Sequence, residues 1–335
     1  MNHPAPITVT REAELPRSIG VGSIVWLEST NPTLPGFNPT DMEAVREMPL
    51  QSRVDRAIAL LKASEPEDGY YLAYSGGKDS DAIKKLCQLA GVSFEAWYNQ
   101  TTIDPPEVVR YIKTQPDVKW NIPEHGNMMM RVSEKNAAPP TRMMRWCCEE
   151  YKEHGGHGRT KVMGVRAAES PKRAKRWSEI AQDQYRNVVI CPIVLWSDDQ
   201  LWEFLRAYEV KYCSLYDEGW TRLGCVGCPL NNKSRLLEFK RWPAFEINWK
   251  KAIIANWTKY HAAKRDNGKP YFHTRFATGE DMWKWWMQEK RGDVLRDDCQ
   301  SMLLWTNEPP SDDAVLSNEQ KLSHGLETNR GAKNL

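Results

Sequence analysis

The sequence lacks the features that would place it in a membrane or outside the cell. None of its apolar runs approaches the roughly 20 residues needed to cross a bilayer. Residues 1–18 contain no positively charged segment followed by an apolar one, as a secretion signal would. There is also no strong charge of one sign, because the formal net charge is only +2, and this value neither requires nor excludes a nucleic-acid partner. We therefore expect a cytoplasmic protein without membrane contact.

Composition otherwise describes an ordinary globular protein, with 41% hydrophobic and 27% charged residues. A length of 335 residues suffices for one large domain or two modest ones. Eight cysteines without a secretion signal indicate a reducing compartment, where thiols serve metals or catalysis more often than disulfides. The unusual count is 15 tryptophans, several of which fall late in the chain.

Helical and strand periods alternate from residue 51 to about residue 192. This alternation predicts an α/β fold with a doubly wound, mainly parallel sheet and helices on both faces. The apolar patterns place strands at residues 70–74, 92–98, 161–165 and 188–193, and helices at residues 54–61, from Pro105-Pro106 and from residue 82. Ser197-x-x-Gln200 has the pattern of a capping box and predicts a helix that runs to Tyr208.

We expect four parts along the chain. They are an N-terminal extension over residues 1–50 with a short strand at residues 24–27, an α/β domain over residues 51–232, a Trp-rich basic helical region over residues 233–306 and a disordered tail over residues 307–335. In the third part, aromatic residues such as Trp249 and Trp257 recur at helical spacing with basic residues between them. A core stripe with a solvated basic face is the favoured interpretation, and a surface on which bases stack is the alternative.

The stretch Ser75-Gly76-Gly77-Lys78-Asp79-Ser80 follows the first predicted strand and has the chemistry of a phosphate-binding loop. Its glycines let backbone amides approach an anion, its lysine supplies a charge and its serines supply hydroxyls. A helix that begins at Asp81 would point its first amides at the same anion. A plain strand-to-helix turn is the alternative, but such a turn needs neither the lysine nor the hydroxyls.

Four cysteines form a second pattern, with Cys147 and Cys148 adjacent and Cys225 three positions before Cys228. A disulfide between the neighbours is disfavoured, because consecutive Cα atoms are about 3.8 Å apart and bridged ones ~4.4–6.8 Å. One zinc ion would need both neighbouring thiolates at about 2.3 Å, whereas a cubane iron–sulfur cluster offers each its own iron. The pattern favours a cluster, with zinc as the alternative. Packing roles are expected for three cysteines in apolar segments, Cys87, Cys191 and Cys213.

A third element is Gly164-Val165-Arg166 at the end of a predicted strand. The glycine and the guanidinium predict an anion clamp for phosphate or sulfate. The cations that follow either extend this clamp or form a solvated helix face; they are Lys172, Arg173, Lys175 and Arg176. His154-Gly155-Gly156-His157 could bind a metal, but a glycine loop with two incidental histidines is favoured.

In this order, SGGKDS, the Cys147-Cys148 pair, GVRAAES, PIVLWSDDQLWEFL and SLYDEGWTRLGCVGCP resemble the phosphoadenosine phosphosulfate (PAPS) reductase family of the PP-loop ATP-pyrophosphatase superfamily. The resemblance covers about residues 51–230. It implies a PP-loop fold like that of the adenine nucleotide alpha-hydrolases. It also implies an adenine nucleotide bound at Ser75, Gly76, Gly77, Lys78, Asp79, Ser80, Gly164 and Arg166, and a [4Fe–4S] cluster on Cys147, Cys148, Cys225 and Cys228.

The chain departs from that family in two ways. Enzymes that reduce adenylyl sulfate generally carry a variant of the loop, whereas this chain keeps the SGGKDS form of ATP users. They also carry a nucleophilic cysteine in a Glu-Cys-Gly-Leu-His motif near the C-terminus. Here only Cys299 follows Cys228, and the neighbouring Asp297 and Asp298 would raise the pKa of its thiol.

The chain is also similar to PP-loop thiolation enzymes, including the sulfur-inserting component of DNA phosphorothioation systems. This resemblance implies that ATP adenylates an oxygen of an acceptor, pyrophosphate leaves, and sulfur displaces AMP. The acceptor would be a nucleic acid or a small molecule, and the sulfur donor a cysteine desulfurase or another protein. The implied catalytic residues are Lys78, which holds pyrophosphate, Asp79, which binds Mg²⁺, and Arg166, which offsets charge in the transition state.

Two alternatives stay open. The chain could be a PAPS or adenylyl-sulfate reductase that uses Cys299 or a thiol of a partner as its nucleophile. It could also be a non-catalytic accessory protein of a mobile-element or defence system that keeps the fold and the cluster.

Overall fold

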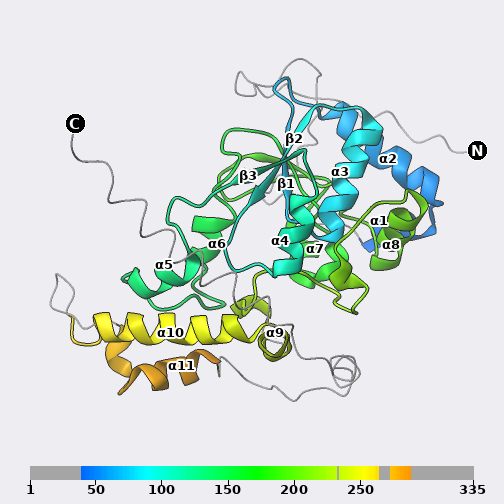
Figure 1. Cartoon of the computed structure of the whole chain (residues 1–335). Coiled ribbons are helices and arrows are strands. Elements are labelled where there is room, and N and C mark those ends of the chain that lie inside the picture. Colours follow the sequence, from blue (N-terminus) through cyan, green and yellow to red (C-terminus); the bar gives the residue numbers. More distant parts are fainter. Residues whose placement is uncertain (1–38, 232–233, 264–271, 288–335) are drawn as a thin grey trace, which may run out of the picture. The chain divides into compact units, whose positions relative to one another are not determined.

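The computed structural model describes residues 39–231, 234–263 and 272–287. Its centre is a sheet of six strands in the order β3-β2-β1-β4-β6-β5 (Figure 1). All neighbouring strands are parallel except β5 and β6, which are antiparallel. The strands are β1 Tyr70–Tyr74, β2 Phe94–Asn99, β3 Val118–Asn121, β4 Lys161–Val162, β5 Ile180–Gln182 and β6 Val188–Ile190. The predicted α/β fold with a mainly parallel sheet is confirmed.

The strand order reverses between β1 and β4. From β1 the chain moves outward through β2 to β3, and it then returns to the opposite side of β1 as β4. In open parallel sheets, ligands bind at such a switch point, beside the carboxyl ends of the strands. The segments after β1 and β4 are therefore the places to look for a site.

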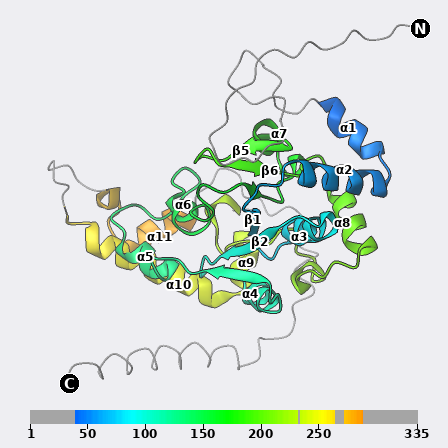
Figure 2. The same ribbon diagram turned by 90° about the horizontal axis from the view of Figure 1, so that it is seen from above.

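Helices cover both sides of the sheet. Figure 2 shows α2, α3 and α8 to one side of β1 and α6 to the other. The helices up to this part of the chain are α1 Pro39–Glu47, α2 Leu50–Ala63, α3 Lys78–Ala90, α4 Pro106–Lys113, α5 Met128–Glu134, α6 Trp146–Tyr151, α7 Pro171–Arg176 and α8 Asp198–Ala207. Short 3-10 turns lie at Ala167–Glu169, Ser214–Tyr216, Pro229–Asn231 and Phe272–Arg275. The predicted capping box is present, because Ser197 accepts from the Gln200 amide and Gln200 accepts from the Ser197 amide.

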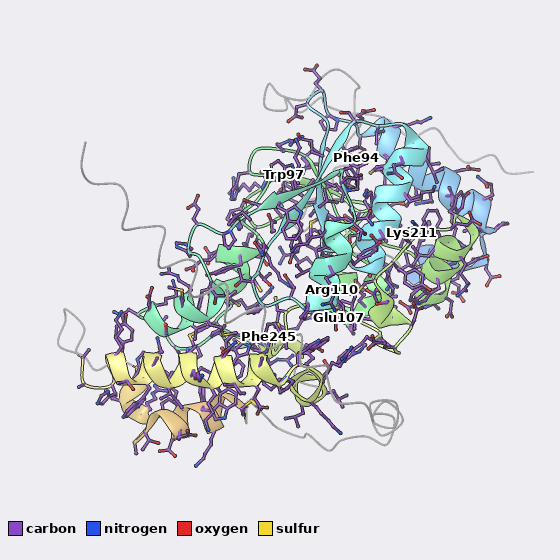
Figure 3. The ribbon with its side chains drawn as sticks, in the orientation of Figure 1. Phe94, Trp97, Glu107, Arg110, Lys211 and Phe245 are labelled. Carbon is purple, nitrogen blue, oxygen red and sulfur yellow. The ribbon has the colours of Figure 1, made fainter. Side chains whose placement is uncertain are left out.

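Three further helices follow, α9 Arg235–Arg241, α10 Pro243–Tyr260 and α11 Gly279–Met287. Figure 1 shows α10 lying between α5 and α11. Glu107 of α4 ties this region to the sheet domain, since Trp242 Nε1 donates to Glu107 Oε2 at 3.1 Å and Arg241 lies 3.4 Å from Glu107 Oε1. Figure 3 shows Glu107 at the end of α4 that faces Phe245 of α10.

The tryptophans of these helices are core residues. Trp249 and Trp286 are among the largest fully buried side chains, and Trp242 and Trp283 are also buried. For these rings the structure therefore confirms the favoured interpretation, which is a core stripe. None of the helices in the described part of the chain combines the length and apolar content that a membrane crossing requires.

Several predicted bounds needed correction. The strand expected over residues 92–98 begins at Phe94, and those expected to reach residues 165 and 193 end at Val162 and Ile190. In both places the apolar run continues past the last residue of the strand. Strands β3 and β5 were missed because each is short and carries polar residues. The strand expected at residues 24–27, the tail over residues 307–335 and Cys299 lie outside the described residues.

Candidate functional site

The segment after β1 forms a tight turn that leads directly into α3. Gly76 has a φ of 69°, and a Cβ there would lie 2.7 Å from Ile112 Cγ1, so both the backbone and the packing require glycine. Gly77 is extended and serves as the N-cap, and α3 begins at Lys78 rather than at Asp81 as predicted. The helix starts earlier because the extended Gly77 already orients the next amides along the helix axis. Lys78, Asp79 and Ser80 thus belong to the first helical turn, where amides face outward.

The two serines of the turn hold it closed. Ser80 Oγ donates to Gly77 O at 2.8 Å and accepts from the Ser75 amide and the Ser75 hydroxyl, each at 3.3 Å. The sequence predicts that these hydroxyls donate to phosphate. In this structure their contacts are to the loop itself, which gives them a part in shaping the turn.

Lys78 is buried, with 5% of its surface exposed. Its backbone amide donates to Tyr216 Oη at 3.0 Å, and its ammonium donates to the carbonyl oxygen of Thr221 at 3.2 Å. The ammonium also lies 3.3 Å from Asp198 Oδ1. A buried ammonium with three N–H donors is suited to phosphate oxygens. In this structure the oxygens near the ammonium are those of Thr221 and Asp198.

Arg166 reaches the same place from the end of β4, and only 3% of it is exposed. Its Nε lies 2.5 Å from Asp79 Oδ1, and its Nη2 lies 2.8 Å from Asp198 Oδ1. The structure therefore brings together Lys78, Asp79 and Arg166, the three residues expected to be catalytic. In this structure the guanidinium and the ammonium both contact the carboxylate of Asp198. Both groups are suited by their chemistry to the oxygens of an anion.

Gly164, which the sequence places in the nucleotide site, also has a packing role. A Cβ at this position would lie 2.9 Å from the carbonyl carbon and oxygen of Asp79. The end of β4 therefore packs directly against the backbone of the first turn of α3. The glycine is needed for this close approach, which brings Arg166 beside Asp79.

Sequence reasoning missed Asp198, Tyr216 and Thr221, which complete the surroundings of Lys78. Asp198 begins α8, and its side chain is 58% exposed although it pairs with two buried cations. The capping box at Ser197 was the available signal, because it places Asp198 in a first helical turn. Tyr216 and Thr221 lie in the stretch SLYDEGWTRLGCVGCP that supports the family resemblance, but no local pattern linked them to Lys78.

A buried carboxyl lies one turn further along α3. Asp81 is buried, and Tyr74 donates its hydroxyl to Asp81 Oδ1 at 2.5 Å. Burial raises the pKa of the Asp81 carboxyl to about 7, against the opposing effect of hydrogen bonds from Tyr74 and Tyr111. The sequence indicated a helix start here and gave no sign of a titrating group.

The cysteines of the second pattern lie on two segments. Cys147 and Cys148 are in the first turn of α6, and Cys225 and Cys228 flank a turn in which the Cys228 amide donates to Cys225 O at 3.2 Å. All four are free thiols, buried or half-buried. The thiols of Cys147 and Cys148 lie within hydrogen-bonding reach of each other. Four cysteines, two on each segment, are the ligand set that a [4Fe–4S] cluster takes.

The four thiols influence one another's ionisation. A hydrogen bond from Cys147 lowers the pKa of the Cys148 thiol to about 6, and the same contact raises the pKa of Cys147. Burial raises the pKa of Cys225 to about 12. Charge on Cys225 raises the pKa of Lys152, with smaller effects of Cys228 and Cys148. Cysteines from both segments therefore act on one ammonium, which would offset the negative charge of a cluster.

The described residues do not hold a ready metal-binding group. In the described ranges, no three His, Cys, Asp or Glu side chains are placed so that they could coordinate one metal ion. The chemistry of the four thiols and of Lys152 fits an iron–sulfur cluster, and the cluster itself is a proposal. Cys87, Cys191 and Cys213 are buried core residues, as predicted.

The remaining predicted elements have structural contacts. His154 Nε2 lies 3.0 Å from Asn121 Nδ2, and the His157 ring packs edge-on against Tyr185. These contacts agree with a loop that carries two incidental histidines. None of the residues of α7 is buried, and Arg173 pairs with Glu169 at 2.7 Å, so the cations of α7 form an exposed helix face.

Comparisons with known proteins agree with this architecture. Residues 69–231 match the model of the phosphoadenosine phosphosulfate reductase domain. An adenosine 5'-phosphosulfate reductase of Staphylococcus haemolyticus is 28% identical over 67 residues, or 20% of this chain and 28% of that protein. An uncharacterized protein of Escherichia phage 186 is 37% identical over 112 residues, or 32% of each chain. An uncharacterized protein of Methanocaldococcus jannaschii is 24% identical over 64% of this chain and 45% of its own length. The chain thus spans less than half the length of each of these relatives.

Solved structures show weaker likenesses. PAPS reductase from Candida auris in a phosphate complex has a TM-score of 0.38 at 12% identity, covering 58% of this chain and 97% of that one. FMN adenylyltransferase from Candida glabrata, with FMN and an ATP analogue, has a TM-score of 0.42 at 12% identity, covering 79% and 86%. Both scores are low, so neither structure carries an argument about this chain.

Proposed function

We propose, from the premise that residues 69–231 form a domain of the phosphoadenosine phosphosulfate reductase family, that this chain is an ATP-dependent sulfur-transfer enzyme. The observation that supports it most is the convergence of a helix N-terminus, a buried ammonium and a buried guanidinium at the switch point of the sheet. Lys78 and Arg166 come from the ends of β1 and β4 and share the carboxylate of Asp198. A site with two buried cations and outward amides is suited to a polyphosphate.

The chemistry proceeds in two steps. An oxygen of the acceptor attacks the α-phosphorus of ATP, the bond to the bridging oxygen breaks, and pyrophosphate leaves. A hydrosulfide equivalent from a sulfur donor then bonds to the acceptor atom that carries the adenylate, and AMP leaves with the oxygen. One ATP and one hydrosulfide give a thiolated acceptor, AMP and pyrophosphate.

The residues of the site have distinct parts in this scheme. The amides after Gly76 and Gly77 and the ammonium of Lys78 would bind the leaving pyrophosphate, with Ser75 and Ser80 shaping the loop. Asp79 would hold Mg²⁺ on the phosphates. Arg166 would offset the negative charge that builds up on the phosphoryl oxygens in the transition state. Asp198 and Tyr216 would give up their contacts with Lys78 to phosphate oxygens.

We place a [4Fe–4S] cluster on Cys147, Cys148, Cys225 and Cys228. When bound, such a cluster would supply an iron-rich site at which sulfur can bind. Lys152 would balance its negative charge. The acceptor, either a nucleic acid or a small molecule, would meet the adenylating site from outside, where the exposed cations of α7 follow Arg166 in the chain.

Two separate incubations, one with ATP and one with phosphoadenylyl sulfate, distinguish this function from the reductase alternative. The purified, iron-loaded protein is incubated under anaerobic conditions with ATP, Mg²⁺, a sulfide source and candidate acceptors, and separately with labelled phosphoadenylyl sulfate and a thiol reductant. Release of pyrophosphate and AMP from ATP is expected. Release of sulfite from the sulfonucleotide without ATP would support the reductase instead. If neither reaction occurs, the result would support an accessory protein.

A further inference from the structure

Two buried tryptophans contact the two segments that carry the paired cysteines. Trp249 of α10 donates its indole N–H to the carbonyl oxygen of Val226 at 3.0 Å, and Val226 lies between Cys225 and Cys228. Trp286 of α11 donates its indole N–H to the carbonyl oxygen of Pro140 at 2.8 Å. Pro140 lies in the segment that leads into Cys147. Each ring therefore uses its polar atom on a different cysteine-bearing segment.

The contact with the Cys225–Cys228 turn is tight. Gly227 has a φ of 77°, and a Cβ there would lie 2.7 Å from the Phe239 ring and 2.8 Å from Trp249 Nε1. The Gly227 amide donates to the buried carboxylate of Glu238 at 2.7 Å. The turn thus accepts one hydrogen bond from Trp249 of α10 and donates one to Glu238 of α9. Buried hydrogen bonds of this kind fix a backbone because leaving either partner unpaired is costly.

The segment before Cys147 is also held from the C-terminal helices. Asn256 Nδ2 donates to the carbonyl oxygen of Lys135 at 2.9 Å. Nearer the cysteine, Trp146 Nε1 donates to the carbonyl oxygen of Ala138 at 3.2 Å. Together with the bond from Trp286 to Pro140, these contacts fix residues 135–146 at several points along their length.

The two tryptophan rings also contact each other. Their centroids are 4.8 Å apart with an interplanar angle of 27°, and the rings are 1% and 0% exposed. Arg235 of α9 lies 4.4 Å over the Trp286 ring and donates to Trp286 O at 2.9 Å. A stacked, buried pair has little freedom to move, so the two segments are linked through one rigid unit.

We infer that the stacked pair of Trp249 and Trp286 sets the distance between the Cys147-Cys148 segment and the Cys225–Cys228 turn, and so positions all four thiols for one cluster. This inference rests on the proposed iron–sulfur site. By this inference, the C-terminal helices α10 and α11 help to build the cluster site in addition to forming part of the core. Outer contacts that orient metal ligands commonly change metal affinity about 10- to 100-fold when removed.

The test uses conservative variants of the full chain. Trp249→Phe and Trp286→Phe keep an aromatic ring and remove the indole donor. Trp257→Phe is the matched control, because Trp257 lies on the same helix as Trp249 and donates to Phe276 O at 3.1 Å, away from the cysteine segments. Iron and acid-labile sulfide are measured after anaerobic purification, and cluster absorbance is followed during challenge with an iron chelator. Far-ultraviolet circular dichroism checks that each variant is folded.

We expect Trp249→Phe and Trp286→Phe to lose the cluster about ten-fold faster than the wild type, and Trp257→Phe to match the wild type. In the apo forms, Trp249→Phe should also alkylate faster than the control at Cys225 and Cys228, and Trp286→Phe at Cys147 and Cys148. Equal rates of cluster loss and alkylation in all three variants would overturn the inference while leaving the cluster intact. A wild-type protein without iron and sulfide would instead overturn the proposed cluster and the inference with it.

Discussion

The guanidinium of Arg166 lies 2.5 Å from the carboxylate of Asp79, and this ion pair joins the ends of β1 and β4 at the switch point of the sheet. The pair is close because Gly164 allows β4 to approach the backbone of Asp79. It also fixes the orientation of the guanidinium, whose second nitrogen holds Asp198. The candidate site is therefore built by contacts between segments far apart in the chain.

Asp198→Asn should strengthen the binding of pyrophosphate. Asp198 shares its carboxylate with Lys78 and Arg166, so it competes with an incoming anion for both cations. Removing its charge should raise pyrophosphate affinity by up to about ten-fold, which is ~1.4 kcal/mol. A larger effect is not expected, because the side chain is largely exposed and solvent screens its charge. Calorimetric titration with pyrophosphate measures this change.

Asp199→Asn is the matched control, since Asp199 is also exposed at the start of α8 and should leave the affinity unchanged. Weaker binding by Asp198→Asn would show that this carboxylate supports the ligand, for example through a metal ion, and does not compete with it.

Gly164→Ala should disturb both stability and nucleotide binding. The added Cβ would meet the Asp79 backbone at 2.9 Å, and backbone atoms cannot move aside as the end of a side chain can. Overpacking of this kind costs about 1–3 kcal/mol and would shift Arg166 away from Asp79. Urea unfolding and ATP titration measure the two effects. Gly224→Ala, where no atom lies within 4 Å of the added Cβ, should change neither; equal effects of the two substitutions would contradict the packing argument.

Stability should depend on pH through Asp81. Burial raises the pKa of this carboxyl to about 7 in the folded protein, above its unfolded value of 3.8. The folded state then binds more protons than the unfolded state between these values, so the Asp81 contribution to stability falls as pH rises from about 4 to about 7. At 1.36 kcal/mol per unit, the fall amounts to roughly 3–4 kcal/mol.

Asp81→Asn removes this titration and keeps an oxygen that can accept from Tyr74. The free energy of unfolding of the variant relative to the wild type should therefore increase between pH 4 and pH 7. Chemical denaturation at a series of pH values provides the measurement. A difference that stays constant across this range would show that Asp81 does not titrate there.

The cysteine assignment predicts iron and sulfide in the isolated protein. Cys148→Ser should abolish the cluster because it removes one of four proposed ligands, whereas Cys213→Ala should retain it, since Cys213 is a buried core residue. Iron and acid-labile sulfide analysis on anaerobically purified protein distinguishes the two variants. Stoichiometric zinc without sulfide in the wild type would favour the zinc alternative.

The sequence predicts those parts of the molecule that local pattern determines. Lys78, Asp79 and their glycines form one continuous motif after an apolar strand, so their place at the carboxyl end of β1 follows from the order of residues. Arg166 was recognised in the same way. The periodicity of the late aromatics likewise indicated a buried face, which Trp249 and Trp286 form.

The sequence does not predict contacts that depend on the folded arrangement. Tyr216 and Thr221 contact Lys78 from 138 and 143 positions away. Their stretch, SLYDEGWTRLGCVGCP, supports the family resemblance, but its residues do not show that it contacts the loop. The packing of Gly164 against Asp79 was not predicted, because it arises only when β1 and β4 are adjacent. The indole donors of Trp249 and Trp286 were missed for the same reason.

The most direct test of the account is an anaerobic calorimetric titration of ATP and Mg²⁺ into the iron-loaded protein and two variants, Lys78→Met and Lys85→Met. Lys78 is buried in the site, and Lys85 lies on the same helix without a role in it. The account predicts saturable binding by the wild type and Lys85→Met, and an affinity lower by about 10- to 100-fold for Lys78→Met, because a charged hydrogen bond contributes about 1.5–3 kcal/mol. Absence of binding by the wild type, or equal affinity of all three proteins, would contradict it.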